Sequence, residues 1–144
     1  MQVLKDRKSS REFSSKELPL QVLSNLLWAA YGVNRTDSGK RPAPSAVSWQ
    51  EIDLYVATAH GLYLYDAKAH TLQPVLSEDI RPMTGLQSFV QDVPMNLIYV
   101  ADHARMGNVT LRKRFFIQRP TQASLARMFT CIVPPKDWRL SRAA

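Results

Sequence analysis

The sequence contains a single cysteine and no long apolar run. Cys131 has no second cysteine to pair with, so an internal disulfide is excluded. No stretch reaches the roughly 18 to 20 apolar residues of a membrane-spanning helix, and the first seven residues lack the apolar core of an export signal. The three histidines are scattered without the spacing of a zinc site. We therefore expect one ordinary cytoplasmic domain that is soluble and has no structural metal.

The first three quarters of the chain carry no net charge. Residues 1–107 hold 11 Lys and Arg against 11 Asp and Glu, whereas residues 108–144 hold 8 basic residues against Asp137 alone. The whole formal charge of +7 therefore lies in the carboxy-terminal segment. A basic segment of this kind suits an acidic partner such as a nucleic acid, and this is one interpretation of the chain.

The apolar spacing predicts one amphipathic helix near the amino terminus. Leucines and alanines recur at helical intervals after Pro19, which suits the first helical position, and Gly32 suits the end. We expect Leu27 and Trp28 to pack in the core rather than to contact a ligand. Residues 33–44 are rich in polar residues, glycine and proline and predict a loop over the surface or over a ligand.

The following segments predict a sheet, so the fold class is α+β. Residues 52–57 and 62–66 are rich in β-branched and aromatic residues around His60-Gly61 and predict a hairpin, with a short third strand at 72–75. Residues 77–91 suggest a helix around Pro82, and residues 94–101 suggest a buried strand. After Gly107 no regular period persists.

A cluster of basic and hydroxyl side chains precedes the predicted helix, in the sequence Arg7-Lys8-Ser9-Ser10-Arg11-Glu12-Phe13. Guanidinium and ammonium groups offer charge-assisted hydrogen bonds to phosphate oxygens, and serine adds a neutral donor. The cluster therefore suits a phosphate. Taken alone, it is more simply interpreted as a solvated surface patch.

Three motifs in order carry a resemblance to the nitroreductase family over about residues 3–107. Arg7, Lys8, Ser9, Arg11 and Phe13 fill the family's opening signature, which grips the phosphate and ribityl chain of FMN. The helix that follows, residues 20–35, is similar to the family's Leu-Leu-Trp-Ala-Ala helix. The third motif lies in residues 41–50.

In the third motif, the family commonly has Pro-Ser-Ala, then an Asn and a Gln beside the flavin. Ser48 departs from this pattern because it stands where relatives carry Asn, and it offers a shorter side chain without an amide. The residues that the resemblance assigns to FMN are Arg7, Lys8, Ser9, Arg11, Pro44, Ser45, Ala46, Ser48 and Gln50.

The resemblance implies a nitroreductase-like fold and an FMN-dependent oxidoreductase. Hydride would pass from NADH or NADPH through FMN to a small-molecule acceptor such as a nitroaromatic or a quinone. The reactive atoms belong to the flavin, so no catalytic side chain is predicted. Intact family members are homodimers, and their second half supplies further flavin contacts that residues 108–144 do not resemble.

The basic segment after residue 107 has an explanation in the genetic code. Back-translation of residues 109–140 in the shifted frame permits an amphipathic, helix-forming string similar to the family's next helix. We therefore interpret residues 1–107 as the amino-terminal part of a nitroreductase-like domain and residues 108–144 as an out-of-frame product of a frameshift near residues 106–108. On this hypothesis the fold is incomplete, and the chain alone binds FMN poorly and lacks turnover.

Two other interpretations remain open. The first is a small nucleic-acid-binding protein that uses the arginine-rich segment, although that segment lacks regularly interleaved aromatics or a groove-reading helix. The second is an interaction fragment that pairs with an intact paralogue.

Overall fold

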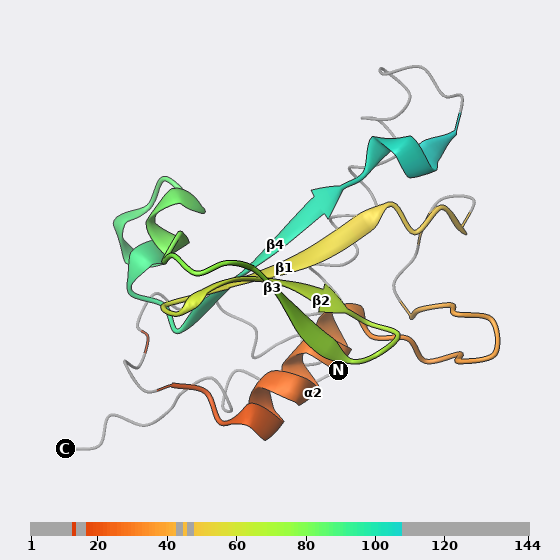
Figure 1. Cartoon of the computed structure of the whole chain (residues 1–144), viewed down its shortest axis with the longest axis horizontal. Coiled ribbons are helices and arrows are strands. Elements are labelled where there is room, and N and C mark those ends of the chain that lie inside the picture. The colour runs from red at the N-terminus through yellow and green to blue at the C-terminus, as the bar shows by residue number, and fades with distance from the viewer. Residues whose placement is uncertain (1–12, 14–16, 43–44, 46–47, 108–144) are drawn as a thin grey trace, which may run out of the picture.

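One α-helix packs against a four-stranded antiparallel sheet in the part of the chain that the structure describes, which is residues 13, 17–42, 45 and 48–107 of this computed structural model (Figure 1). The strand order is β3-β2-β1-β4. The elements are α2 (Leu20–Tyr31), β1 (Ile52–Thr58), β2 (Gly61–Asp66), β3 (Thr71–Leu76) and β4 (Met95–Ala101). The predicted α+β class, the helix and the three-stranded arrangement of hairpin and third strand are therefore confirmed.

The helix α2 begins and ends where its proline and glycine predict. The helix begins at Leu20, so Pro19 is the residue just before the helix rather than the predicted first residue. The Pro19 carbonyl accepts a hydrogen bond from Leu23 N at 3.0 Å. At the other end, Gly32 N donates to Trp28 O at 2.7 Å. A Cβ at Gly32 would lie 2.5 Å from that carbonyl oxygen, so only glycine fits this close approach.

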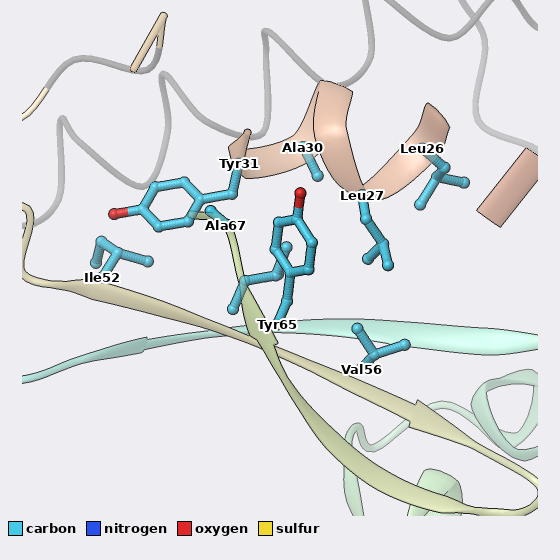
Figure 2. Close-up of a cluster of buried hydrophobic side chains, with 9 residues drawn as sticks. Leu26, Leu27, Ala30, Tyr31, Ile52, Val56, Tyr65 and Ala67 are labelled. Carbon is cyan, nitrogen blue, oxygen red and sulfur yellow. The ribbon is translucent and has the colours of Figure 1, made fainter. Parts of the chain in front are cut away.

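The core lies between α2 and one face of the sheet (Figure 2). Alternate residues of β1 point at the helix, as the two-residue period of a strand requires, and Leu54 and Val56 are fully buried. Burying each such aliphatic side chain contributes about 1.5–3 kcal/mol. The buried members of the cluster are Leu26, Leu27, Ala30, Tyr31, Ile52, Leu54, Val56, Tyr65 and Ala67.

Neighbouring residues of α2 differ sharply in burial. Leu27 is 3% exposed and packs in the core as predicted, but Trp28 is 49% exposed, so the prediction that it packs in the core was wrong. The buried stripe consists of Leu26, Leu27, Ala30 and Tyr31. Trp28 falls one residue beyond the paired positions 26 and 27, and the 100° step of the helix turns its side chain away from the sheet.

The segment predicted as a helix around Pro82 forms no α-helix. It contains two short 3₁₀ helices, Arg81–Met83 and Ser88–Gln91, which pack against each other without buried residues. The Asn96 side chain, from β4, donates to Thr84 Oγ1 at 2.7 Å and to Val90 O at 3.1 Å. The segment is therefore held by tertiary hydrogen bonds rather than by a helical repeat.

The strand β4 runs along β1 in full register, but it is less buried than its apolar sequence predicted. Six of its seven residues are half-buried and Val100 is 43% exposed, because the strand lies at the edge of the described sheet. Within the described residues, no helix is long and apolar enough to cross a membrane.

Candidate functional site

A cavity of about 310 Å³ lies where the end of α2, the loop that follows it and the start of β1 meet. Its volume falls at the lower end of the range for small-molecule sites. The described residues in its walls are Tyr31, Arg35, Lys40, Arg41, Pro42, Ser45, Ser48, Gln50, Glu51 and Ile52.

The loop over the cavity closes on itself. Arg35 and Lys40 form an antiparallel bridge, in which Arg35 N donates to Lys40 O at 3.2 Å. Gly39 makes the turn possible with a φ of 63°. Arg35 Nη2 donates to Arg41 O at 2.7 Å and fixes the chain as it leaves the turn. The loop predicted from composition is therefore an ordered hairpin-like turn at the cavity.

Arg41 connects this loop to the end of the helix. Its Nη1 donates to Tyr31 O at 2.6 Å, and its guanidinium carbon lies 3.9 Å from the centre of the Tyr31 ring, a cation–π distance. Its Nε donates to Gln50 Oε1 at 3.3 Å. Burial lowers the pKa of the Arg41 guanidinium, although the nearby Tyr31 opposes this, and an arginine nonetheless stays charged. A positive charge is thus held in the cavity wall.

Ser45 organises the other wall through its hydroxyl group. Ser45 Oγ accepts a hydrogen bond from Gln50 N at 2.8 Å and donates one to Glu51 Oε2 at 2.9 Å. Gln50 Nε2 donates in turn to Gly39 O at 3.2 Å. Ser48 and Gln50 both have positive φ, 56° and 48°, which non-glycine residues seldom adopt. Such strained conformations cluster at ligand sites and persist because surrounding bonds hold them.

Glu51 places a carboxyl group under the cavity. The residue is fully buried, and its Oε1 has no hydrogen-bond partner within the described part of the chain. Its main-chain oxygen accepts from Asp102 N at 2.7 Å, which ties the start of β1 to the segment after β4. A buried polar atom without a partner costs free energy, and such atoms occur at functional sites more often than elsewhere.

Of the residues assigned to FMN by the resemblance, Ser45, Ser48 and Gln50 line the cavity. The amide of Gln50 bonds to the protein itself at both ends. Phe13, from the opening signature, stacks on Phe89 with ring centres 5.8 Å apart, and it is not among the described residues of the cavity wall. The remaining assigned residues, Arg7, Lys8, Ser9, Arg11, Pro44 and Ala46, lie outside the described residues.

The sequence did not assign seven of the described residues in the cavity wall to the site, which are Tyr31, Arg35, Lys40, Arg41, Pro42, Glu51 and Ile52. A signal for two of them is present. Lys40 and Arg41 are adjacent cations just before the proline-rich motif. No pattern of spacing marks Tyr31, because it belongs to the apolar stripe of α2.

The fold and the cavity together define an α+β domain with a cavity of small-molecule size beside a strained loop. Comparison with known proteins specifies the class further. The sequence profile of the Nitroreductase family matches residues 4–127. This chain belongs to the nitroreductase family. The match extends past residue 107, and the boundary and change of frame near that position stay predictions.

Similar proteins include one from Methanocaldococcus jannaschii named "Putative nitroreductase", which is 32% identical over 117 residues covering 74% of this chain and 59% of that protein. A crystal structure from Ralstonia eutropha, also assigned as a nitroreductase, matches with a TM-score of 0.82 and 43% identity over 90% of this chain and 61% of that one. The chain thus spans about three fifths of the length of these relatives.

A more distant structure shares the fold alone. It is a chain of the Escherichia coli microcin synthetase complex, which matches 88% of this chain and 56% of its own length with a TM-score of 0.69 and 16% identity. The nitroreductase-like fold predicted from the sequence is therefore confirmed. The nucleic-acid interpretation depended on residues 108–144, which lie outside the described residues, and nothing in the comparisons favours it.

Proposed function

We propose that this chain carries flavin-binding residues of an FMN-dependent oxidoreductase that passes hydride from NADH or NADPH through FMN to a nitroaromatic or quinone-like acceptor. The observation that carries the proposal is the loop from Ser45 to Gln50. In a chain of the nitroreductase family, this loop forms a wall of a positively charged cavity with two strained residues.

The chemistry of the described walls suits FMN. The cavity has the cations Arg35, Lys40 and Arg41 on one side, which suit a phosphate, and polar oxygens and amides on the other, which suit the hydroxyls of a ribityl chain. When bound, FMN supplies the hydride-transfer chemistry.

The protein's own contribution is to hold this site in one shape. Arg41 fixes the loop to the end of α2 through Tyr31, and Ser45 fixes the opposite wall through Gln50 N and Glu51. Because these bonds are formed before a ligand arrives, binding does not have to order the loop, and less conformational entropy is lost. No described side chain is needed to donate or accept a proton in this scheme.

The proposal is tested by mixing the purified chain with FMN, removing free ligand by desalting and recording the visible absorbance. Ser45→Ala removes the hydroxyl that orders the loop and should reduce the retained flavin band. Ser38→Ala is the matched control, because Ser38 is an exposed residue at the tip of the loop and does not line the cavity.

The predicted change of frame is tested beside it, with a second protein whose reading frame is restored after Gly107. We expect the restored protein to retain more flavin than the chain as it stands. Equal, stoichiometric binding by both would contradict the change of frame but support FMN as the cofactor. No flavin band in either protein would contradict the proposed function. Resequencing the gene across residues 106–108 checks the frame directly.

A further inference from the structure

The cations at the cavity lack carboxylate partners, unlike the other described arginines. Among the described residues, the ion pairs of arginine involve only Arg81 and Arg105, and none involves Arg35, Lys40 or Arg41. The two cavity arginines donate instead to uncharged oxygens, a side-chain amide and a main-chain carbonyl in each case. Three positive charges therefore converge on one cavity with no carboxylate paired to them.

The main chain fixes where these charges stand. The bridge between residues 35 and 40 holds two of the side chains at the same end of the loop, and Arg41 follows directly. Arg35 and Lys40 are exposed, so in the absence of an anion they are hydrated at little cost. Two guanidinium groups and one ammonium group are the donor set that proteins use for phosphate.

The cavity wall also carries neutral polar side chains. The hydroxyl groups of Ser45 and Ser48 and the amide of Gln50 lie in the same wall, and such groups hydrogen-bond to sugar or ribityl hydroxyls. Glu51 belongs to the wall as well, but it is fully buried, so its carboxyl group is not exposed to a ligand. The cavity thus suits a ligand that carries a phosphate and hydroxyl groups, which is the chemistry of a nucleotide.

We propose that Arg35, Lys40 and Arg41 form a subsite for the phosphate of a nucleotide ligand in this cavity. The inference rests on the proposed function, because FMN and NADPH both carry a phosphomonoester. It differs from the assignment of the FMN phosphate to residues 7–11, since it draws on a separate loop. The shared chemistry is a terminal phosphate, and the experiment distinguishes its two sources.

The test is isothermal titration of the full chain at fixed ionic strength with inorganic phosphate, FMN, riboflavin, NADPH and NADH. The variants are Arg35→Gln, Lys40→Gln and the double variant, which replace exposed cations with neutral residues. Lys68→Gln is the matched control, since Lys68 is also exposed but lies in the turn between β2 and β3, outside the cavity wall. Circular dichroism confirms that each variant is folded.

We expect each single substitution to weaken binding of the phosphate-bearing ligand about tenfold and the double substitution about a hundredfold, as for loss of one and two charge-assisted hydrogen bonds. A loss for FMN without a loss for riboflavin identifies the flavin phosphate. A loss for NADPH without a loss for NADH identifies the dinucleotide phosphate. Either result supports the subsite, provided that Lys68→Gln binds like the unaltered chain.

Three results overturn the subsite: affinities of the double variant that match the unaltered chain, equal losses for ligands with and without the phosphate, or an equal loss in Lys68→Gln. The proposed function fails separately. If the chain binds inorganic phosphate and loses it in the double variant, but binds neither flavin nor dinucleotide, the subsite stands and the proposed function does not. Binding of none of the five probes contradicts both.

Discussion

The described arginines fall into two regions that differ in the groups to which the guanidinium donates hydrogen bonds. Arg105 forms a two-pronged pair with Asp53 at 2.8 and 2.9 Å, and Arg81 is paired in the same way with its neighbouring aspartate at 2.9 and 2.7 Å. At the cavity, Arg35 and Arg41 meet only uncharged oxygens among the described residues. The same residue type is thus paired with carboxylates in one region and hydrogen-bonded to neutral groups in the other.

The two regions also shift the acid–base equilibrium of arginine in opposite directions. Hydrogen bonds donated to the carboxylates of Asp53 and Asp79 raise the pKa of Arg105 and Arg81. Burial lowers the pKa of Arg41. A charge that is buried without an opposite charge costs free energy, and an anionic ligand offsets that cost. The pKa values therefore distinguish the two structural ion pairs from the arginine at the cavity.

The largest expected effect comes from a substitution in the hydrophobic core. Leu27→Ala should lower the free energy of unfolding by about 3 kcal/mol, because Leu27 is 3% exposed and its loss leaves a cavity against β1. Urea denaturation followed by circular dichroism measures the change. Trp28→Ala is the control one residue away. Since Trp28 is half exposed, a loss as large as that of Leu27→Ala would contradict the assigned face of α2.

Arg41→Ala tests what the arginine without a carboxylate partner contributes at the cavity. We expect the free energy of unfolding to fall by about 2 kcal/mol, because the hydrogen bonds to Tyr31 O and Gln50 Oε1 and the contact with the Tyr31 ring are lost together. Affinity for phosphate should fall as well. Thermal unfolding with and without phosphate measures both effects. An Arg41→Ala chain that phosphate still stabilises normally would remove Arg41 from the proposed subsite.

Arg105→Ala removes an ion pair of the other region and should lower the free energy of unfolding by less, about 1 kcal/mol. Its pair with Asp53 is partly exposed, with 42% and 27% of the two side chains accessible, so solvent weakens the attraction. Arg105 Nη1 also donates to Gln50 O in the cavity wall at 3.2 Å, so affinity for phosphate should fall slightly and far less than in Arg35→Gln, as measured by titration. A loss of phosphate binding comparable with that of Arg35→Gln would show that the two regions are not separate.

The smallest effect is a pH dependence confined to the paired region. Arg81 holds the pKa of Asp79 below its ordinary value, so the stabilisation is complete above about pH 4 and is lost as the pH falls through the lowered pKa. Urea midpoints of the unaltered chain and Asp79→Asn should therefore differ at pH 7 and pH 5, and the difference should shrink steadily as the pH falls below about 4. In an Arg81→Gln background the difference at pH 7 should shrink, and an undiminished difference would place the effect elsewhere.

Local signals predicted the elements of this fold well. Pro19 and Gly32 mark the ends of α2, and the alternating strands at 52–58 and 61–66 carry their own turn. The prediction of a helix around Pro82 was wrong because contacts distant in the sequence order this segment. Its hydrogen bonds come from Arg81 to Val93 O and from the side chain of Asn96, and no period of the sequence reports such contacts.

The candidate site was only partly visible for a related reason. Ser45 and Gln50 lie in one motif and contact each other through a local bond. Tyr31 and Glu51 meet the same cavity from the end of a helix and the start of a strand, and only the packing of α2 on the sheet brings them together. The resemblance to the family identified the motif with Ser45 and Gln50, whereas only the structure showed that Tyr31 and Glu51 lie beside it.

The bridge between Arg35 and Lys40 has a consequence for how this protein can change over evolution. It closes the loop at its base, and among the described residues the hydrogen bonds that hold the tip, residues 36–39, are those of this closure and the one accepted by Gly39 O. A Cβ at Gly39 would meet nothing within 4 Å, so space does not restrict the tip, although its positive φ does. Substitutions at Thr36, Asp37 and Ser38 can therefore accumulate without disturbing either the core or the described wall of the cavity.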